Sequence, residues 1–175
     1  MRRGVQVSFW EASPTRDTGT EQFKKIHSCF EPSGTRTKED LIPGCFFWYY
    51  EYMDNCVFCK ISNDKIILTS DKSSAFYDSF PVTQGHTLII PKRHVKSYFE
   101  LEPSEKEDIW NLVDNVKNFL DENFNPDGYN IGINIGETAG QTVFHCHIHV
   151  IPRYKGDIAN PKGGVRGVIP DKQKY

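Results

Sequence analysis

The feature that most constrains the fold is FHCHIHVIPR, residues 144–153, where histidine recurs at every second position three times. Successive side chains of a β-strand point to opposite faces, so His145, His147 and His149 would share one face. A helix would place residues i and i+2 about 200° apart and scatter the three rings. The segment therefore predicts a half-buried strand. A polar face in water would explain one or two histidines, but three in register indicate a functional site.

Composition limits the class of protein. The chain has 175 residues, 38% of them hydrophobic, which suits one globular domain with a modest core. Its start lacks the continuous apolar region of a secretory signal, and no stretch of the sequence is suited to span a membrane. The net charge of −2 gives no global attraction to nucleic acid. An odd number of cysteines, five, favours free or metal-binding thiols over a disulfide framework. We therefore expect a cytoplasmic protein with no membrane and no stable nucleic-acid partner.

The pattern changes near Met53. Residues 1–52 mix charged and small polar residues without a sustained period, which predicts an irregular or partly docked extension. Within it, CFFWYYEYM (45–53) is densely aromatic and is expected to pack on the domain or on a partner. Regular structure is predicted for a domain over residues 53–152.

The last segment, residues 153–175, forms a basic tail with six Lys/Arg and two Asp. Its prolines and glycines predict an extended coil. Lys155, Lys162 and Arg166 are candidates to reach a polyphosphate leaving group, although a basic tail is more often simply a solvated surface.

Five short apolar, β-branched or aromatic runs predict strands. They span residues 65–70, 74–78, 86–91, 129–135 and 143–152. Between the third and fourth runs, Ser104 and Glu107 have the spacing of a capping box. Apolar residues then recur at helical spacing from Ile109 to Leu120, which predicts an amphipathic helix that ends near Phe124. One long helix among consecutive strands indicates an α+β fold in which the helix covers one face of the sheet.

These segments resemble a known family. HCHIHVI (145–151), GETAGQT (136–142) and IIPKRH (89–94) closely resemble the histidine-triad (HIT) family of nucleotide hydrolases and transferases. The resemblance covers Met53 to Tyr175, and residues 1–52 have no recognised counterpart. It implies an α+β, HIT-like fold with a five-stranded, mainly antiparallel sheet, one long helix and a short N-terminal helix. It also implies a homodimer that joins two such sheets.

The resemblance assigns the chemistry to two histidines. His147 is expected to attack the α-phosphate of a nucleotide and to form a nucleotidyl-histidine, which water then hydrolyses. A neutral imidazole nitrogen is a suitable nucleophile at pH 7, provided that the other ring nitrogen donates to a fixed acceptor, a main-chain carbonyl by family resemblance. His149 lies one strand repeat further and is expected to donate to a phosphate oxygen.

The resemblance also marks substrate contacts. Gln141 and Thr142 follow a glycine-containing segment and resemble the phosphate contacts of the family. Asn134 matches a polar contact near the α-phosphate, and Asp78 matches the carboxylate that accepts from the ribose hydroxyls. Without the neighbouring triad, the glycine-containing segment would equally fit an ordinary connection between strands.

A second group of residues predicts a metal site. Cys56, Cys59, His94 and His145 have the ligand types of a closed tetrahedral zinc site. The zinc-binding, bacterial-type branch of the family uses such a Cys-x-x-Cys pair together with two histidines at these positions. We expect Zn²⁺ to be structural and to brace the nucleophile without touching substrate. A reduced cysteine pair with a surface His94 is the alternative.

Three function classes compete. A metalloenzyme would bind one ion with all three triad histidines, but three alternating positions extend over about 13 Å, too far for ligand distances near 2 Å. A nucleotide-binding regulatory module with slow phosphoramidase or nucleotidyltransferase activity stays open. The favoured function is hydrolysis at the α-phosphate of dinucleoside polyphosphates, such as diadenosine tetraphosphate, or of related adenylylated compounds. Phe76 and Phe80 are interpreted as core residues in preference to base contacts.

Overall fold

The structure is a computed structural model that describes residues 56–174. The predicted extension, residues 1–52, and any helix before Cys56 lie outside the described residues. Between Cys56 and the first strand, the described chain forms a turn and the 3-10 turn η2 (Asn63–Lys65). Within residues 56–174, no helix is both long and apolar enough to cross a membrane.

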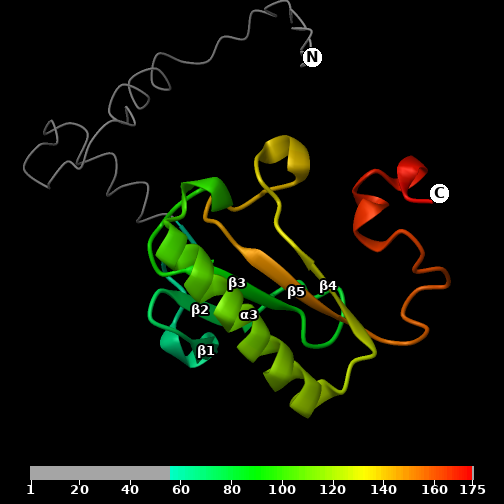
Figure 1. Cartoon of the computed structure of the whole chain (residues 1–175), viewed down its shortest axis with the longest axis horizontal. Helices are drawn as coiled ribbons and strands as arrows, with labels where there is room; N and C mark the ends of the chain where they lie inside the picture. Colours follow the sequence, from blue (N-terminus) through cyan, green and yellow to red (C-terminus); the bar gives the residue numbers. More distant parts are fainter. Residues whose placement is uncertain (1–55, 175) are drawn as a thin grey trace, which may run out of the picture. The chain divides into compact units, whose positions relative to one another are not determined.

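Five strands form a single antiparallel sheet (Figure 1). They are β1 (Ile66–Thr69), β2 (Ser73–Tyr77), β3 (Thr87–Pro91), β4 (Gly128–Gly132) and β5 (Ile148–Arg153). Their order across the sheet is β1-β2-β3-β5-β4, and every neighbouring pair is antiparallel. The predicted α+β fold with five strands is confirmed. β5, the last strand in the sequence, therefore lies inside the sheet, between β3 and β4.

The helix α3 (Pro103–Phe124) crosses one face of this sheet (Figure 1). It ends at Phe124 as predicted, because Asn125 adopts the left-handed conformation, with φ 48°. The predicted capping box of Ser104 and Glu107 is wrong. The box is formed by Glu102 and Glu105 instead. Pro103 takes the first helical position and forces the residue before it out of the helical region, so the cap falls at residue 102.

The two faces of the sheet have different coverings. The face under α3 carries the main core, to which the helix contributes the predicted apolar positions. These positions are Ile109, Leu112, Val113, Val116 and Leu120. The opposite face carries a smaller apolar cluster of Phe76, Leu88 and Ile90. His149 of β5 pairs with Leu88 of β3, so the side chain of His149 lies on this second face, away from the helix.

The predicted strand over residues 143–152 is too long at its start. β5 begins at Ile148, so His145 and His147 precede it. Continuing the register would pair Cys146 with Pro91, which has no N–H to donate. The N–H of Cys146 donates to Val95 O at 2.6 Å instead. The alternation nevertheless persists, because Cys146 and Ile148 are buried under α3.

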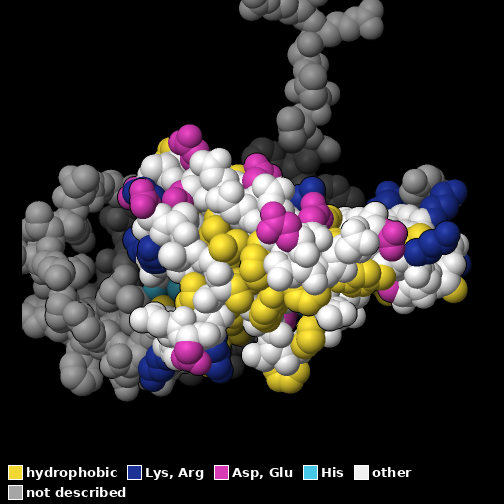
Figure 2. Space-filling view, turned by 90° about the horizontal axis from the view of Figure 1, so that it is seen from below, with side chains coloured by type: hydrophobic (Ala, Val, Ile, Leu, Met, Phe, Trp, Pro, Cys, Tyr) yellow, Lys and Arg dark blue, Asp and Glu magenta, His cyan; other side chains and the backbone are white. Residues whose placement is uncertain are grey.

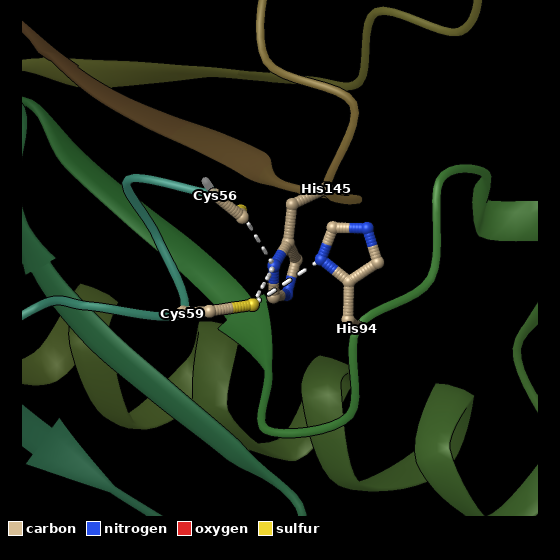
Figure 3. Close-up of side chains that lie close together, drawn as sticks. All are labelled: Cys56, Cys59, His94 and His145. Carbon is tan, nitrogen blue, oxygen red and sulfur yellow. Dashed lines mark hydrogen bonds between the residues drawn. The ribbon is translucent and has the colours of Figure 1, made fainter. Parts of the chain in front are cut away.

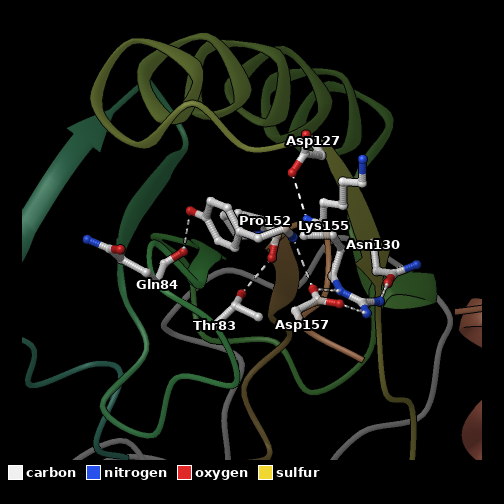
Figure 4. A network of polar contacts seen from close by, with 9 residues as sticks. Thr83, Gln84, Asp127, Asn130, Pro152, Lys155 and Asp157 are labelled. Atoms are coloured by element: carbon white, nitrogen blue, oxygen red, sulfur yellow. Dashed lines mark hydrogen bonds and ion pairs between the residues drawn. The ribbon is translucent and has the colours of Figure 1, made fainter. Parts of the chain in front are cut away.

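The C-terminal tail is not the extended coil that its composition predicts. It forms two 3-10 turns, η5 (Gly164–Val168) and η6 (Pro170–Lys172). At its start, Arg153 donates to both carboxylate oxygens of Asp157, at 2.6 and 2.8 Å, and to Asn130 Oδ1 of β4 (Figure 4). Arg153 lowers the pKa of Asp157 to about 2, so this anchor stays charged at neutral pH. The tail is thus fixed to the sheet where it leaves β5.

One side of the described part exposes apolar side chains in a continuous area (Figure 2). Among the exposed large hydrophobic residues, Tyr77, Phe80 and Val82 belong to the end of β2 and the loop after it. Phe80 is 88% exposed, so its interpretation as a core residue is wrong, whereas Phe76 is buried at 4%. The alternation of β2 explains the difference for Phe76, which faces the second apolar cluster, while Phe80 lies beyond the strand.

Candidate functional site

Two thiols and two imidazoles meet at one edge of the site (Figure 3). Cys56 and Cys59 come from the turn before β1, His94 from the loop after β3, and His145 from the segment before β5. Their ligand atoms all lie within 4.8 Å of one another. Cys59 Sγ is 3.2 Å from His94 Nδ1 and 3.5 Å from His145 Nδ1. The structure therefore brings together the four residues predicted as metal ligands.

The protonation of these groups fits a zinc ion. His145 Nε2 donates to the carbonyl oxygen of Pro91 at 2.9 Å, which leaves the lone pair on Nδ1, the nitrogen that faces both sulfurs. Burial lowers the pKa of His145 to about 4, so the ring is neutral, as a ligand must be. Burial, followed by the hydrogen bond with Cys56, raises the pKa of Cys59 to about 12. Two adjacent thiolates would therefore require a cation, and S₂N₂ is a donor set typical of structural zinc.

His147 has one ring nitrogen fixed by the backbone. Its Nδ1 lies 2.7 Å from the carbonyl oxygen of His145, and because a carbonyl only accepts, Nδ1 carries the proton. This carbonyl is the fixed main-chain acceptor that the nucleophile was predicted to need. In the neutral ring the lone pair is then on Nε2. The residue is 6% exposed, so its orientation is set by packing as well as by this hydrogen bond.

His149 receives its orientation from a fourth histidine. The N–H of Val82 donates to His86 Nδ1 at 3.3 Å, so the neutral His86 ring carries its proton on Nε2. That Nε2 lies 3.0 Å from His149 Nδ1, which must accept, so His149 carries its own proton on Nε2. His149 Nε2 is buried and has no hydrogen-bond partner among residues 56–174. It is therefore an N–H donor held beside the His147 ring, whose centroid is 5.1 Å away.

Burial keeps the His86 and His149 rings neutral by lowering the pKa of each. Burial lowers the pKa of His86, and the carboxylate of Asp78, 3.5 Å from His86 Nδ1, only partly opposes this effect. Burial, followed by the neighbouring His147 and His86 rings, lowers the pKa of His149 to about 4. Asp78, His86 and His149 also have the donor types of a metal site. Within this group the hydrogen bond joins His86 Nε2 to His149 Nδ1, while Asp78 Oδ2 lies 3.5 Å from the other nitrogen of the His86 ring.

The predicted phosphate contacts in the loop before the triad differ in how many hydrogen bonds they already make within the protein. The side chain of Gln141 is buried, and its amide nitrogen donates to Lys96 O at 2.8 Å and to Val143 O at 3.1 Å. Its carbonyl oxygen accepts from Gly136 N at 2.8 Å. Gln141 therefore joins the two ends of the loop over residues 136–141. Thr142 is exposed and Asn134 is half-buried.

Other predicted contacts are also engaged within the protein. Asp78 accepts from the N–H of Phe80 at 2.9 Å, while its second oxygen faces His86. In the tail, Arg166 donates to the carbonyl oxygens of Lys172 and Gln173, at 3.0 and 3.3 Å, and thereby closes the loop over the two 3-10 turns. Contact of the tail with a leaving group stays a prediction.

Two residues of the site are not identifiable from the sequence pattern. His86 stands at the start of an apolar strand run, outside the alternating segment, and the signal it offers is a titratable residue in otherwise apolar surroundings. Phe58 lies inside the Cys-x-x-Cys turn, and its ring centroid is 5.2 Å from that of His147. Nothing in the spacing of the chain indicates that this turn reaches the central histidine.

Comparison with known proteins agrees with this geometry. The family model described as the HIT domain matches residues 60–156, more than half of the chain. The chain belongs to the HIT family. A HIT relative, the protein hit of Bacillus subtilis, is 40% identical over 109 residues, covering 59% of this chain and 75% of the relative. A bis(5'-adenosyl)-triphosphatase of Dictyostelium discoideum is 40% identical over 100 residues, covering 57% of this chain and 67% of that enzyme.

A solved HIT structure bears on the metal centre. A zinc-bound histidine triad family protein from Mycobacterium smegmatis is 35% identical, with a TM-score of 0.56, covering 61% of this chain and 81% of that one. The Cys/His cluster of this chain therefore has the composition to bind a metal within a HIT fold for which a zinc-bound example exists.

Proposed function

We propose that this HIT protein is a nucleotide hydrolase that acts at the α-phosphate of dinucleoside polyphosphates, such as diadenosine tetraphosphate, or of related adenylylated compounds. The observation that carries the proposal is the pairing of tautomers in the triad. His147 presents an unprotonated Nε2, and His149 presents a buried Nε2–H without a partner among residues 56–174. A nucleophile beside an N–H donor is the arrangement that nucleotidyl transfer requires.

The residues of the chain then act in two displacements. In the first, the Nε2 lone pair of His147 forms a bond to the α-phosphorus, and the bond to the leaving phosphate oxygen breaks. A polyphosphate leaves as an anion and needs no proton from the protein. In the second, water attacks the same phosphorus and loses a proton to solvent, and the bond to Nε2 breaks to release the mononucleotide. His149 Nε2–H stabilises the charge on the phosphoryl oxygens in both transition states.

Substrate positioning is assigned to four further groups. Thr142 and Asn134 would donate to the phosphate from the loop side. Gln141 would join them only by exchanging one of its present hydrogen bonds, so its contribution includes holding the loop. Asp78 would accept from the ribose hydroxyls with the oxygen that now faces His86.

Zinc is proposed to be a structural cofactor held by Cys56, Cys59, His94 and His145. When bound, it would supply a fixed point for the turn before β1 and for His145 without touching substrate. A homodimer is proposed because the family resemblance implies a dimer that joins two such sheets, and β4 is an edge strand of the described sheet. The cytoplasm is proposed because it keeps thiols reduced.

The experiment that tests the function measures transfer of a labelled α-phosphate from substrate to protein. Diadenosine tetraphosphate labelled at the α-phosphate should transfer label to the full-length protein during turnover, and the label should be acid-labile and base-stable. His147→Ala should abolish turnover and label yet still bind nucleotide, because the other contacts remain. His149→Ala, the matched control, should still take up label at a lower rate. Label on His147→Ala at the level of the unmodified protein would show that the nucleophile is a different residue.

A further inference from the structure

The turn that carries the two cysteines also carries an aromatic ring that touches the proposed nucleophile. Phe58 lies between Cys56 and Cys59 in the sequence. Its ring meets the His147 ring edge-on, with 5.2 Å between centroids and 77° between planes. It also meets Phe76 at 5.5 Å and His145 at 6.1 Å. Phe58 thus joins the apolar cluster on the triad face to the histidine that is proposed to attack phosphorus.

The hydrogen bond from Nδ1 to His145 O fixes one atom of the His147 ring. Rotation of the imidazole about its Cβ–Cγ bond would break that hydrogen bond and move Nε2 away from the substrate. The ring is confined by Phe58 at 5.2 Å and by His149 at 5.1 Å, both nearly perpendicular to it. Packing against these two rings therefore opposes the rotation, and a productive direction of Nε2 depends on it.

The turn itself has little internal support for Phe58. Its backbone hydrogen bonds, Lys60 N to Cys56 O and Ile61 N to Phe58 O, are long at 3.3 and 3.4 Å. Val57 is 63% exposed, so most of its side chain faces solvent. The side chains of Cys56 and Cys59, one on each side of Phe58, both point at His145 Nδ1. Ligation of both sulfurs would fix the turn at two points and leave the residue between them little freedom.

We propose that Phe58 is a positioning residue for His147, and that it transmits the order of the Cys56–Cys59 metal site to the nucleophile. The inference rests on the proposed role of His147. Its consequence is that a metal remote from the substrate controls the rate of transfer through one phenyl ring. The ring acts on the orientation of the imidazole, so its loss lowers kcat.

The kinetic test uses the full-length protein and a neighbour as control. Phe58→Ala should lower kcat by about three- to tenfold, the loss expected for one aromatic contact, with KM changed less than about twofold. Phe58→Leu should recover part of the loss, and Val57→Ala should have no effect. All variants should retain metal. A higher KM with unchanged kcat would instead make Phe58 a wall of the substrate site and would overturn the proposal.

A second measurement tests the link to the metal. Removing zinc with a chelator, below the melting temperature of the metal-free protein, should lower kcat more in the unmodified protein than in Phe58→Ala, because both changes release the same ring. If removal of zinc lowers kcat by the same factor in both proteins, the metal and the Phe58 ring act independently, which contradicts the inference.

A third measurement does not depend on turnover. Nitrogen chemical shifts of ¹⁵N-histidine-labelled protein report which ring nitrogen is protonated. His147 should be the pure Nδ1–H tautomer in the metal-loaded protein and a mixture in Phe58→Ala and in the metal-free protein. If the tautomer is unchanged in both, Phe58 does not orient the ring. If nucleotide cleavage is absent altogether while the tautomer responds as expected, the proposed function fails and the positioning role stands.

Discussion

Removal of the imidazole of His86 is the most direct test of how the site sets its tautomers. The ring is 3% exposed, it accepts from Val82 N at 3.3 Å, and its Nε2–H donates to His149 Nδ1 at 3.0 Å. In His86→Ala, His149 Nδ1 would lose the donor that keeps its proton on Nε2. Both neutral tautomers of His149 would then be populated, and those with Nε2 unprotonated could not donate to a phosphate oxygen.

The size of the effect follows from the one hydrogen bond that is lost. A hydrogen bond of this kind contributes about 0.5–1.5 kcal/mol net, and about 1.4 kcal/mol corresponds to a factor of ten in rate. The expected fall in kcat for His86→Ala is therefore about two- to twelvefold. Removal of the donor itself, in His149→Ala, should cost on the order of 10²–10³. The two variants should thus differ by at least about eightfold.

The assay compares kcat for mononucleotide release from diadenosine tetraphosphate, with melting temperatures to account for the buried cavity. His86→Gln provides the matched variant, because the terminal amide nitrogen of glutamine reaches about as far as Nε2 and can donate to His149 Nδ1. It should recover most of the rate. If His86→Ala is as slow as His149→Ala, or as fast as the unmodified protein, the tautomer argument is wrong.

Two further predictions concern stability. The free energy of unfolding should fall as the pH decreases from 6.5 toward 4, because burial lowers the pKa of His149 from 6.5 to about 4 and the unfolded chain binds more protons in that window. Melting curves between pH 4 and 7.5 test this, and His149→Asn should flatten the profile; an unchanged slope would contradict the assignment. Purified protein should carry about one zinc per chain, and a chelator or Cys56→Ser should lower the melting temperature before it affects nucleotide binding. Metal-free protein with the same melting temperature would refute the structural role.

Sequence periodicity predicts the parts of the fold that depend on burial. The apolar positions of α3 from Ile109 to Leu120 recur at helical spacing because one face of the helix packs on the sheet, and all five are buried. The limits of elements depend on single backbone groups and are harder to predict. Pro103 moves the helix cap to Glu102, and Pro91 stops the β3–β5 ladder before the first two triad histidines.

The cluster of Cys56, Cys59, His94 and His145 was predictable because ligand chemistry restricts residue types, and the chain has only five cysteines and six histidines. The group of Asp78, His86 and His149 was not, because its members come from three different segments and meet through side chains whose direction the sequence does not encode. A sequence identifies which groups are available. Only the sheet order places the start of β3 beside β5, and so places His86 beside His149.

The triad shows why identical residues on one face acquire different chemistry. His145 and His147 both donate to main-chain carbonyls, but through opposite nitrogens: Nε2 to Pro91 O in the first, Nδ1 to His145 O in the second. The unprotonated nitrogen is consequently Nδ1 toward the sulfurs in His145 and Nε2 in His147. In His149, Nδ1 accepts a hydrogen bond from His86, so the proton of the ring is on Nε2. One ring is thus suited to a metal, one to phosphorus and one to an oxygen, and the backbone and His86 make the choice. The role of each histidine in the triad therefore depends on the hydrogen-bond partner of its ring, since the residue type is the same at all three positions.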